Sequence, residues 1–376
     1  MRRAAQRVAV VGLLGTAGMA RAEPWLVTIE SGAEADSNVA RVESGAGMPA
    51  RIAAPVGRAG ARVDHRGHLL DGGYALSMSG LARMVVSARA KDENVMLYAG
   101  EARWLRTLGS RPVAAGISIT AADALSMTGG IGARTFRNLG ADGLLSLAGG
   151  DDRHLTLALG GRDFTYKQDH GFDWRGLVAN ARLDFVLWQT PGKTRSLELG
   201  ATLGFEARSY ASNALTDVCP PDAAPSDTCS AGTSLPRRDR YQRAGLELSW
   251  AGEVVATAGY QLTVIDSNSY GQSLIRHRIT TSATAELAHR LFGTATAALQ
   301  IDQYPDGVLV EDDNLQHQEF TNLEDENRSS LQVRIARELS GGWSLEGRGA
   351  VWRDFGNASA GSFRRELVYA GVIYSR

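Results

Sequence analysis

The segment Ser196 to Arg208 reads SLELGATLGFEAR, and it decides the fold class. Apolar residues at 197, 199, 201, 203, 205 and 207 alternate with polar residues or glycine at the positions between them. Successive side chains of a β-strand point to opposite faces, so apolar residues at every second position indicate a strand with one apolar face. The segment is therefore predicted to be a strand that faces an apolar medium on one side and water on the other.

The same alternation recurs along the chain, for example in 153–164, 182–187, 246–250 and 331–338. Many of these segments exceed the ~5–6 residues typical of strands in soluble sheets, and they are long enough for a tilted membrane crossing. Extended to the whole sequence, the pattern predicts sixteen strands, at 25–38, 57–70, 73–88, 93–107, 112–124, 139–148, 153–164, 174–188, 194–208, 240–251, 254–265, 275–288, 293–303, 329–339, 342–353 and 364–375.

Short and long connections alternate between these segments. The short ones are 71–72, 109–111, 149–152, 190–193, 252–253, 290–292 and 340–341. The long ones are 39–56, 125–138, 165–173, 209–239, 266–274, 304–328 and 354–363, and the 89–92 link alone is short where a long one is expected. Tight turns on one side and long loops on the other are typical of barrels in the bacterial outer membrane. We therefore predict an all-β, transmembrane, antiparallel up-and-down barrel of about sixteen strands, with both termini periplasmic.

Two alternatives to this barrel stay open. If residues 39–56 belong to an N-terminal plug, the barrel has fourteen strands and begins at residue 73. If the apolar faces pack against each other, the chain is a soluble secreted β-sandwich, although that fold gives no reason for loops to alternate in length. Tryptophans near strand ends favour the membrane interpretation, because interfacial girdles are rich in aromatic residues. They are Trp25, Trp104, Trp174, Trp188, Trp250, Trp343 and Trp352.

The first residues predict export. Arg2 and Arg3 precede an apolar run over 8–19, and Ala20-Arg21-Ala22 supplies an A-x-A exit. This is the pattern of a cleaved secretory signal, so we divide the chain into a signal peptide at 1–22 and an outer-membrane barrel at 23–376. The 40 basic and 41 acidic residues nearly cancel, which excludes a surface built to bind polyanions. We expect no nucleic-acid partner.

Two local features resemble known outer-membrane barrels. The first strand leads from Gly32 into Asp36-Ser37-Asn38, which is similar to the glycine-then-DSN opening of barrels that secrete polysaccharide or surface lipoproteins. The scarcity of lysine, with only Lys91, Lys167 and Lys193, resembles proteins of myxobacteria, where related barrels serve exopolysaccharide export and the gliding-motility envelope complex. The resemblance implies a porin-like barrel or an export channel. The C-terminus departs from it, since the final aromatic residue, Tyr374, lies two residues before the end.

The sequence offers no motif for catalysis. It contains no G-x-S-x-G elbow, H-E-x-x-H helix or P-loop. The pairs Asp151-Asp152 and Asp169-His170 resemble the acid pairs of barrel proteases only superficially, because they fall in connections predicted to lie on opposite sides of the membrane. His65 and His68 form only a loose pair. We therefore predict a non-enzymatic protein with no catalytic residue, no metal site and no cofactor.

The polar faces of the predicted strands carry charges of both signs. Charge is tolerated inside a wet barrel, whereas an Arg at the midplane of the lipid face costs about 2–4 kcal/mol. The set can line a polar conduit, or its members can neutralise one another in a salt-bridge lattice that partly plugs the lumen. The residues predicted to line the lumen are Arg162, Arg182, Asp184, Glu198, Glu206, Arg208, Arg243, Glu247, Arg276, Arg278, Glu286, Asp302, Arg334, Glu338, Glu346 and Arg348.

Cys219 and Cys229 lie in the predicted 209–239 loop, and an exported protein meets an oxidising compartment. We predict a disulfide between them. As partners we expect outer-membrane lipid and lipopolysaccharide, other proteins of an envelope complex or a secreted polymer. The predicted function is a porin-like channel or the membrane-embedded component of polysaccharide export or gliding motility. A closed structural scaffold barrel is the alternative.

Overall fold

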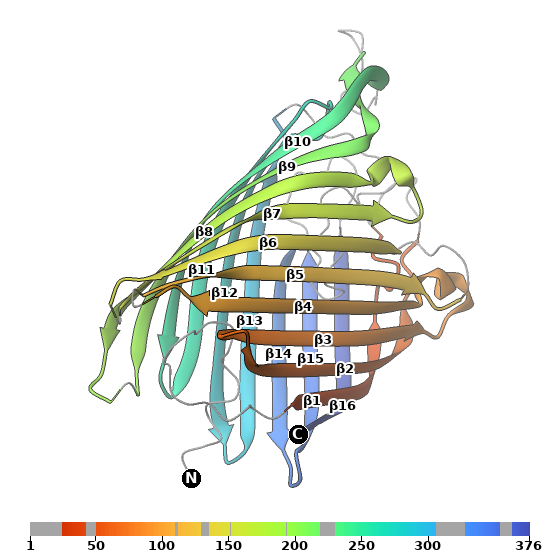
Figure 1. Cartoon of the computed structure of the whole chain (residues 1–376). Helices are drawn as coiled ribbons and strands as arrows, with labels where there is room; N and C mark the ends of the chain where they lie inside the picture. The colour runs from red at the N-terminus through yellow and green to blue at the C-terminus, as the bar shows by residue number, and fades with distance from the viewer. Residues whose placement is uncertain are drawn as a thin grey trace.

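The structure is a computed structural model that describes residues 25–42, 50–109, 112–128, 135–150, 152–192, 194–218, 230–305, 328–353 and 363–376. Its strands form one closed antiparallel barrel, in which each strand pairs with its sequence neighbours and β1 pairs with β16 (Figure 1). The strands are β1 (Leu26–Asp36), β2 (Ala54–Leu69), β3 (Gly72–Val85), β4 (Val95–Thr107), β5 (Val113–Ser126), β6 (Phe136–Ala148), β7 (Arg153–Tyr166), β8 (Trp174–Gln189), β9 (Ser196–Asp217), β10 (Ser230–Ala251), β11 (Val254–Ser267), β12 (Leu274–Ala288), β13 (Leu291–Gln303), β14 (Ser329–Glu338), β15 (Trp343–Arg353) and β16 (Arg364–Ser375).

The prediction of a sixteen-stranded up-and-down barrel is confirmed, and the fourteen-stranded alternative is wrong. β1 does not belong to a plug, because it pairs along its length with both β2 and β16. Closure leaves no unpaired edge, which satisfies the backbone polar groups within the sheet. No helix in the described part of the chain is long and apolar enough to cross a membrane.

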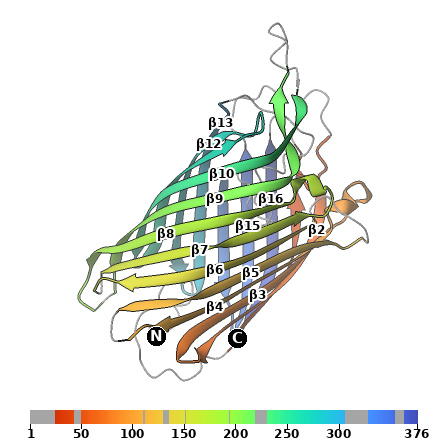
Figure 2. The same ribbon diagram turned by 45° about the horizontal axis from the view of Figure 1, so that its top comes forward.

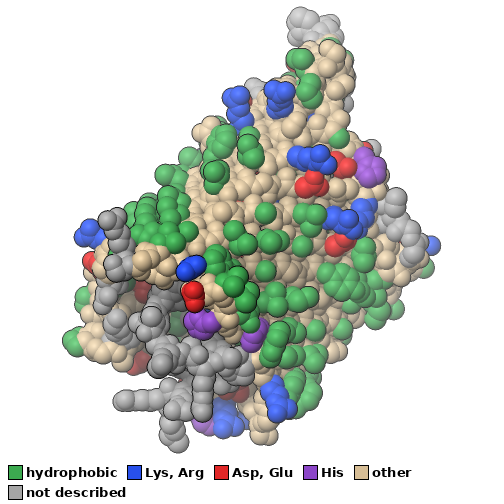
Figure 3. Space-filling view, in the orientation of Figure 1, with side chains coloured by type: hydrophobic (Ala, Val, Ile, Leu, Met, Phe, Trp, Pro, Cys, Tyr) green, Lys and Arg blue, Asp and Glu red, His purple; other side chains and the backbone are tan. Residues whose placement is uncertain are grey.

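The outer face of the barrel is apolar. On β9 the exposed Leu203 and Phe205 point outward, and they alternate with the inward Thr202, Gly204 and Glu206. Residues opposite each other in the register share a face, so this assignment extends strand by strand around the barrel. Figure 3 shows hydrophobic side chains spread over the outer surface. Such a surface is stable against lipid rather than water, as in transmembrane barrels.

Both termini lie at the end of the barrel that carries the short turns. Val27 and Arg376 exchange backbone hydrogen bonds of 2.8 and 2.9 Å there. The turn between β2 and β3 places Leu70 and Asp71 at positive φ, 52° and 59°, as the tightest hairpin turns require. The long connections all lie at the opposite end, which we call the long-loop end. In outer-membrane barrels long loops are extracellular and short turns periplasmic.

Two connections differ most from the sequence-based expectation. The link between β3 and β4 runs over 86–94 and includes a short 3-10 segment (Ala88–Glu93), so it is not the short exception predicted at 89–92. More of the predicted 209–239 loop is strand than was expected, because β9 continues to Asp217 and β10 begins at Ser230. This hairpin rises above the rest of the barrel (Figure 2). Above the lipid the outward face meets water, so the apolar alternation that marks a strand stops there.

The tryptophans divide into two groups, which corrects the prediction that all seven form girdles. Trp25, Trp104, Trp188, Trp250 and Trp343 lie on the outer face at the short-turn end, where Trp188 stacks on Trp250 at 5.7 Å. Trp174 and Trp352 instead point inward at the long-loop end and are buried. A position near a strand end fits either face, so only the register separates the two groups. The signal at 1–22 and the bond between Cys219 and Cys229 lie outside the described residues and stay predictions.

Candidate functional site: the inner face of the barrel

The register defines one continuous inner face. All sixteen charged residues predicted to line the lumen lie on it, opposite the exposed apolar side chains. Arg334, for example, pairs with Arg348 on β15 and alternates with the exposed Val333 and Ile335. It stays a prediction that these residues line an open conduit, because a position on the inner face does not by itself show that solutes pass through the barrel.

The prediction missed further charged residues on this face. Most belong to β1–β4, where charged or glycine residues recur at every second position, as in Glu30, Gly32, Glu34 and Asp36, so the alternation itself was the available signal. Two others were hidden in the predicted 209–239 loop. The missed residues are Glu30, Glu34, Asp36, Arg58, Arg62, Asp64, Arg66, Arg83, Glu101, Arg103, Asp142, Arg237, Asp239 and Arg365.

Positive and negative charges balance on the inner face of the described strands. Together the predicted and missed sets hold fifteen arginines and fifteen carboxylates. Many are paired directly, such as Arg276 with Asp302 at 2.8 Å and Arg162 with Asp142 at 2.7 Å. A wall with equal numbers of both signs has no net field to select cations over anions strongly.

Toward the short-turn end the inner face is wet. The side chains of Arg62, Arg103, Arg182, Glu247 and Arg334 are 56%, 48%, 47%, 46% and 47% exposed although all point into the barrel. Each of these groups is ion-paired, yet about half of its side chain is not covered by protein, and a charged group is left uncovered only where water reaches it. This half of the barrel therefore encloses solvent.

The wall of β11–β13 is lined by small hydroxyl-bearing side chains. Thr257 contacts Ser282 and Thr284 contacts Thr294 through hydroxyl hydrogen bonds of 3.0 Å each. Thr280, also on the inner face, is exposed. Small polar side chains leave the interior unfilled, as expected for a sixteen-stranded barrel, whose diameter exceeds what side chains can pack.

The inner face changes at the long-loop end, where its side chains are buried. We call this belt of buried inward side chains the inner ring. It combines ion pairs with aromatic groups and draws on both walls of the barrel. Its members include Asp36, Arg83, Phe136, Tyr166, Trp174, Glu206, Asp239, Tyr241, Trp352 and Arg365, each less than one-tenth exposed.

One part of the inner ring crosses the seam where β16 closes onto β1. The Asp36 carboxylate accepts hydrogen bonds from Arg365 Nε and Nη2 at 3.1 and 2.7 Å, and from Arg83 Nη2 at 2.5 Å. Glu34 lies 3.8 Å from Arg83 and 3.4 Å from Arg58, which also bonds Glu30. We call these groups the seam cluster. Because they come from β1, β2, β3 and β16, the cluster ties the first strands to the last.

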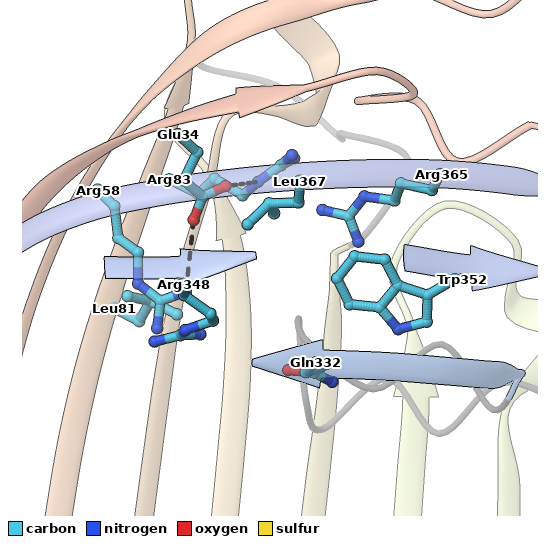
Figure 4. A pocket seen from close by; sticks show the side chains of 9 residues that line it. All are labelled: Glu34, Arg58, Leu81, Arg83, Gln332, Arg348, Trp352, Arg365 and Leu367. Carbon is cyan, nitrogen blue, oxygen red and sulfur yellow. Dashed lines mark hydrogen bonds and ion pairs between the residues drawn. The ribbon is translucent and has the colours of Figure 1, made fainter. Parts of the chain in front are cut away.

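A small cavity lies within the seam cluster (Figure 4). Four arginines line it together with Glu34, Gln332 and the ring of Trp352, which lies 4.7 Å below the Arg365 guanidinium. Its volume of about 20 Å³ holds about one water molecule. It is too small for a solute, so it belongs to the wall of the ring and does not form a binding pocket of its own.

The opposite wall is built around Arg208. Its guanidinium lies between the rings of Trp174 and Tyr241, 4.0 Å from each centroid, and its Nε donates to Glu206 at 2.6 Å. Stacking and ion pairing together hold the group in one position. Beside it, Arg237 stacks on Tyr210 at 4.2 Å and bonds Asp239 at 2.7 Å.

Tyr369 fills the inner face at the seam. Gly32 and Gly371 are directly paired, and a Cβ at either position would clash with the Tyr369 side chain at 2.5 or 2.0 Å. The ring therefore lies across both glycines and covers backbone that would otherwise be bare. Its hydroxyl is buried without a hydrogen-bond partner in the described part of the structure. The ring, and not the hydroxyl, holds Tyr369 in place.

The described residues hold no cluster of three or more His, Cys, Asp or Glu groups suited to a metal ion. His65 lies on the outer face and stacks on Trp25 at 4.1 Å, so it does not pair with His68, which faces inward. Asp169 caps a short 3-10 segment (His170–Phe172) by accepting from Gly171 N at 2.8 Å. Asp151 lies outside the described residues.

No protein-family model matches the sequence, and no curated protein matches it either. Solved structures resemble it in shape. A bacterial polysaccharide outer membrane secretin is 9% identical, with a TM-score of 0.44 over 93% of this chain and 98% of that one. The outer membrane protein OprD from Pseudomonas aeruginosa is 10% identical, with a TM-score of 0.43 over 94% and 93%. OccAB3 from Acinetobacter baumannii is 9% identical, with a TM-score of 0.43 over 94% and 98%. The barrel assignment itself rests on the strand pairing of this chain.

Proposed function

We propose that the protein is a non-enzymatic channel of the bacterial outer membrane that passes hydrophilic solutes. The observation that carries the proposal is the set of half-exposed charged side chains inside a closed barrel whose outside is apolar. An interior that is wet and polar beneath a lipid-facing exterior is the arrangement of porins. On this proposal, solutes cross the wet part of the barrel at the short-turn end and then pass the inner ring.

The charge balance supports a weakly selective channel. Because arginines and carboxylates are equal in number on the described inner face, solute size and fit to the inner ring decide passage more than charge does. Export of a polysaccharide, or a place in a gliding-motility complex, is the narrower form of this proposal. It is supported by the resemblance of the 32–38 segment to secretion barrels.

A closed scaffold barrel is the second candidate, and the inner ring favours it. Buried ion pairs such as Asp36 with Arg365 are equally compatible with a closed barrel and with one that contains a passage. Uptake of sugars and small polymers of graded size into protein-loaded vesicles separates the two functions. A channel admits small solutes up to a size limit, and a scaffold admits none without partners.

Removal of Trp352 sharpens the vesicle experiment. Trp352→Ala shortens a buried inner-ring side chain, so we expect the size limit to rise. Trp343→Ala is the matched control, because this tryptophan lies on the outer face at the opposite end of the same strand. Equal, zero uptake for the folded wild type and for Trp352→Ala contradicts the channel proposal and favours the scaffold.

A further inference from the structure

The outward face of β6–β8 changes from apolar to charged at the long-loop end. On β6 the outward positions from Leu139 to Leu147 are all Leu, Ala or Gly, and the next outward position toward the long-loop end is Arg137. On β8, Arg175 likewise follows directly on the exposed Leu177. The change marks the height at which the lipid-facing belt stops. Charged side chains at that height lie beside lipid headgroups.

Three cations gather there on adjacent strands. Arg137 Nε donates to Asp123 at 3.0 Å, and Lys167, just after β7, contacts the same carboxylate. Arg175 Nε donates to Asp163 at 2.7 Å. Figure 3 shows positive and negative side chains gathered near this edge of the outer surface. We call Arg137, Lys167 and Arg175, with their two aspartates, the outer basic patch.

The patch presents donors outward. The side chains of Arg137 and Arg175 are 56% and 86% exposed, and each uses Nε for its aspartate. The terminal guanidinium nitrogens, which make the bidentate contact with a phosphate, have no further hydrogen bond within the described chain. Within the patch two carboxylates face three cations, and the neighbouring Asp173 is already bonded to Tyr166 N and in contact with His170. The aspartates therefore orient the arginines without neutralising the patch.

We propose that the outer basic patch binds the phosphate groups of a glycolipid in the leaflet at the long-loop end. The proposal rests on the placement of the barrel in an outer membrane, not on whether the lumen conducts. Phosphate fits because guanidinium and ammonium groups both bind it through charge-assisted hydrogen bonds. At the opposite end of the barrel, aromatic side chains such as Trp188, Trp250 and Trp343 lie on the outer face. The exposed arginines there, Arg106, Arg153 and Arg195, lie at separate turns.

The test compares the full chain with two triple variants of equal charge change. Arg137→Gln, Lys167→Gln and Arg175→Gln together remove the patch. Arg106→Gln, Arg153→Gln and Arg195→Gln together form the control, because these exposed arginines lie at the short-turn end. Native mass spectrometry in mild detergent measures retention of diphosphoryl lipid A, of the same glycolipid without phosphates, and competition by inorganic phosphate.

The wild type and the control are expected to retain the phosphorylated lipid, and the patch variant to bind it about tenfold or more weakly. Equal binding by all three proteins overturns the proposal, as does equal retention of the dephosphorylated lipid. Displacement by millimolar inorganic phosphate overturns the assignment to a lipid and indicates a simple anion site. Vesicle uptake by the patch variant is expected to match the wild type, so a failure of the channel proposal is seen separately.

Discussion

Replacement of Asp36 by Asn is expected to destabilise the barrel strongly. The change preserves the size of the side chain but removes the charge that faces Arg83 and Arg365, whose side chains are 5% and 2% exposed. Breaking a buried ion pair on one side destabilises a protein by about 3–5 kcal/mol, because the remaining charge stays buried without compensation. Arg83 retains Glu34 at 3.8 Å, so the lower end of this range applies. About 3 kcal/mol corresponds to a factor of about 10² in the unfolding equilibrium constant.

Urea unfolding of the vesicle-inserted protein measures this loss. Tryptophan fluorescence and the fraction that migrates as a folded, heat-modifiable band report the same transition. Glu366→Gln is the control on the same side of the barrel, because Glu366 and its partner Arg364 are about half exposed and such pairs contribute about 0–1 kcal/mol. If Asp36→Asn unfolds at the same urea concentration as Glu366→Gln, the seam cluster does not stabilise closure and the reasoning fails.

Three further predictions test other parts of the structure. Leu203→Arg puts a charge on the lipid face and should cost about 2–4 kcal/mol, whereas Asn180→Arg at the same height on the wet inner face should cost far less; equal unfolding midpoints contradict the assignment of faces. Tyr369→Ala uncovers the paired glycines and should cost about 3 kcal/mol. Tyr369→Phe should leave the unfolding midpoint unchanged or raised, because the lost hydroxyl has no hydrogen-bond partner in the described structure, and a large loss of stability for Phe contradicts this. A disulfide between Cys219 and Cys229 predicts a reductant-dependent gel shift of the unboiled protein and no reaction with a thiol reagent, and quantitative labelling of both thiols without reductant contradicts it.

The fold was predictable because a lipid-facing strand must show its apolar face at every second residue. This constraint holds for all sixteen strands, so their existence and order follow from the sequence. The constraint lapses where the strands leave the lipid, so the sequence pattern predicts a loop for the upper part of the β9–β10 hairpin. Arg237 and Asp239 were lost from the predicted lumen set for the same reason.

The inner ring could not be predicted in detail. Asp36 and Arg365 are 329 residues apart, and their contact depends on the register with which β16 meets β1. The sequence pattern does not distinguish Trp352 from Trp343, since each lies at the end of a strand. In the structure Trp352 stacks against Arg365 inside the barrel, and Trp343 lies on the outer face. Which face a terminal residue takes is set by pairing with neighbouring strands, and periodicity alone does not supply that information.

The measurement that tests the channel proposal most directly is single-channel recording of the purified, heat-modifiable wild-type protein in planar bilayers. A weakly selective channel is expected to give discrete conductance steps, and a reversal potential near zero in a salt gradient because the charges of the described inner face balance. Absence of conductance in bilayers that demonstrably contain the folded barrel contradicts the channel proposal. A strongly shifted reversal potential is consistent with a channel but contradicts the weak charge selectivity expected from equal numbers of arginines and carboxylates.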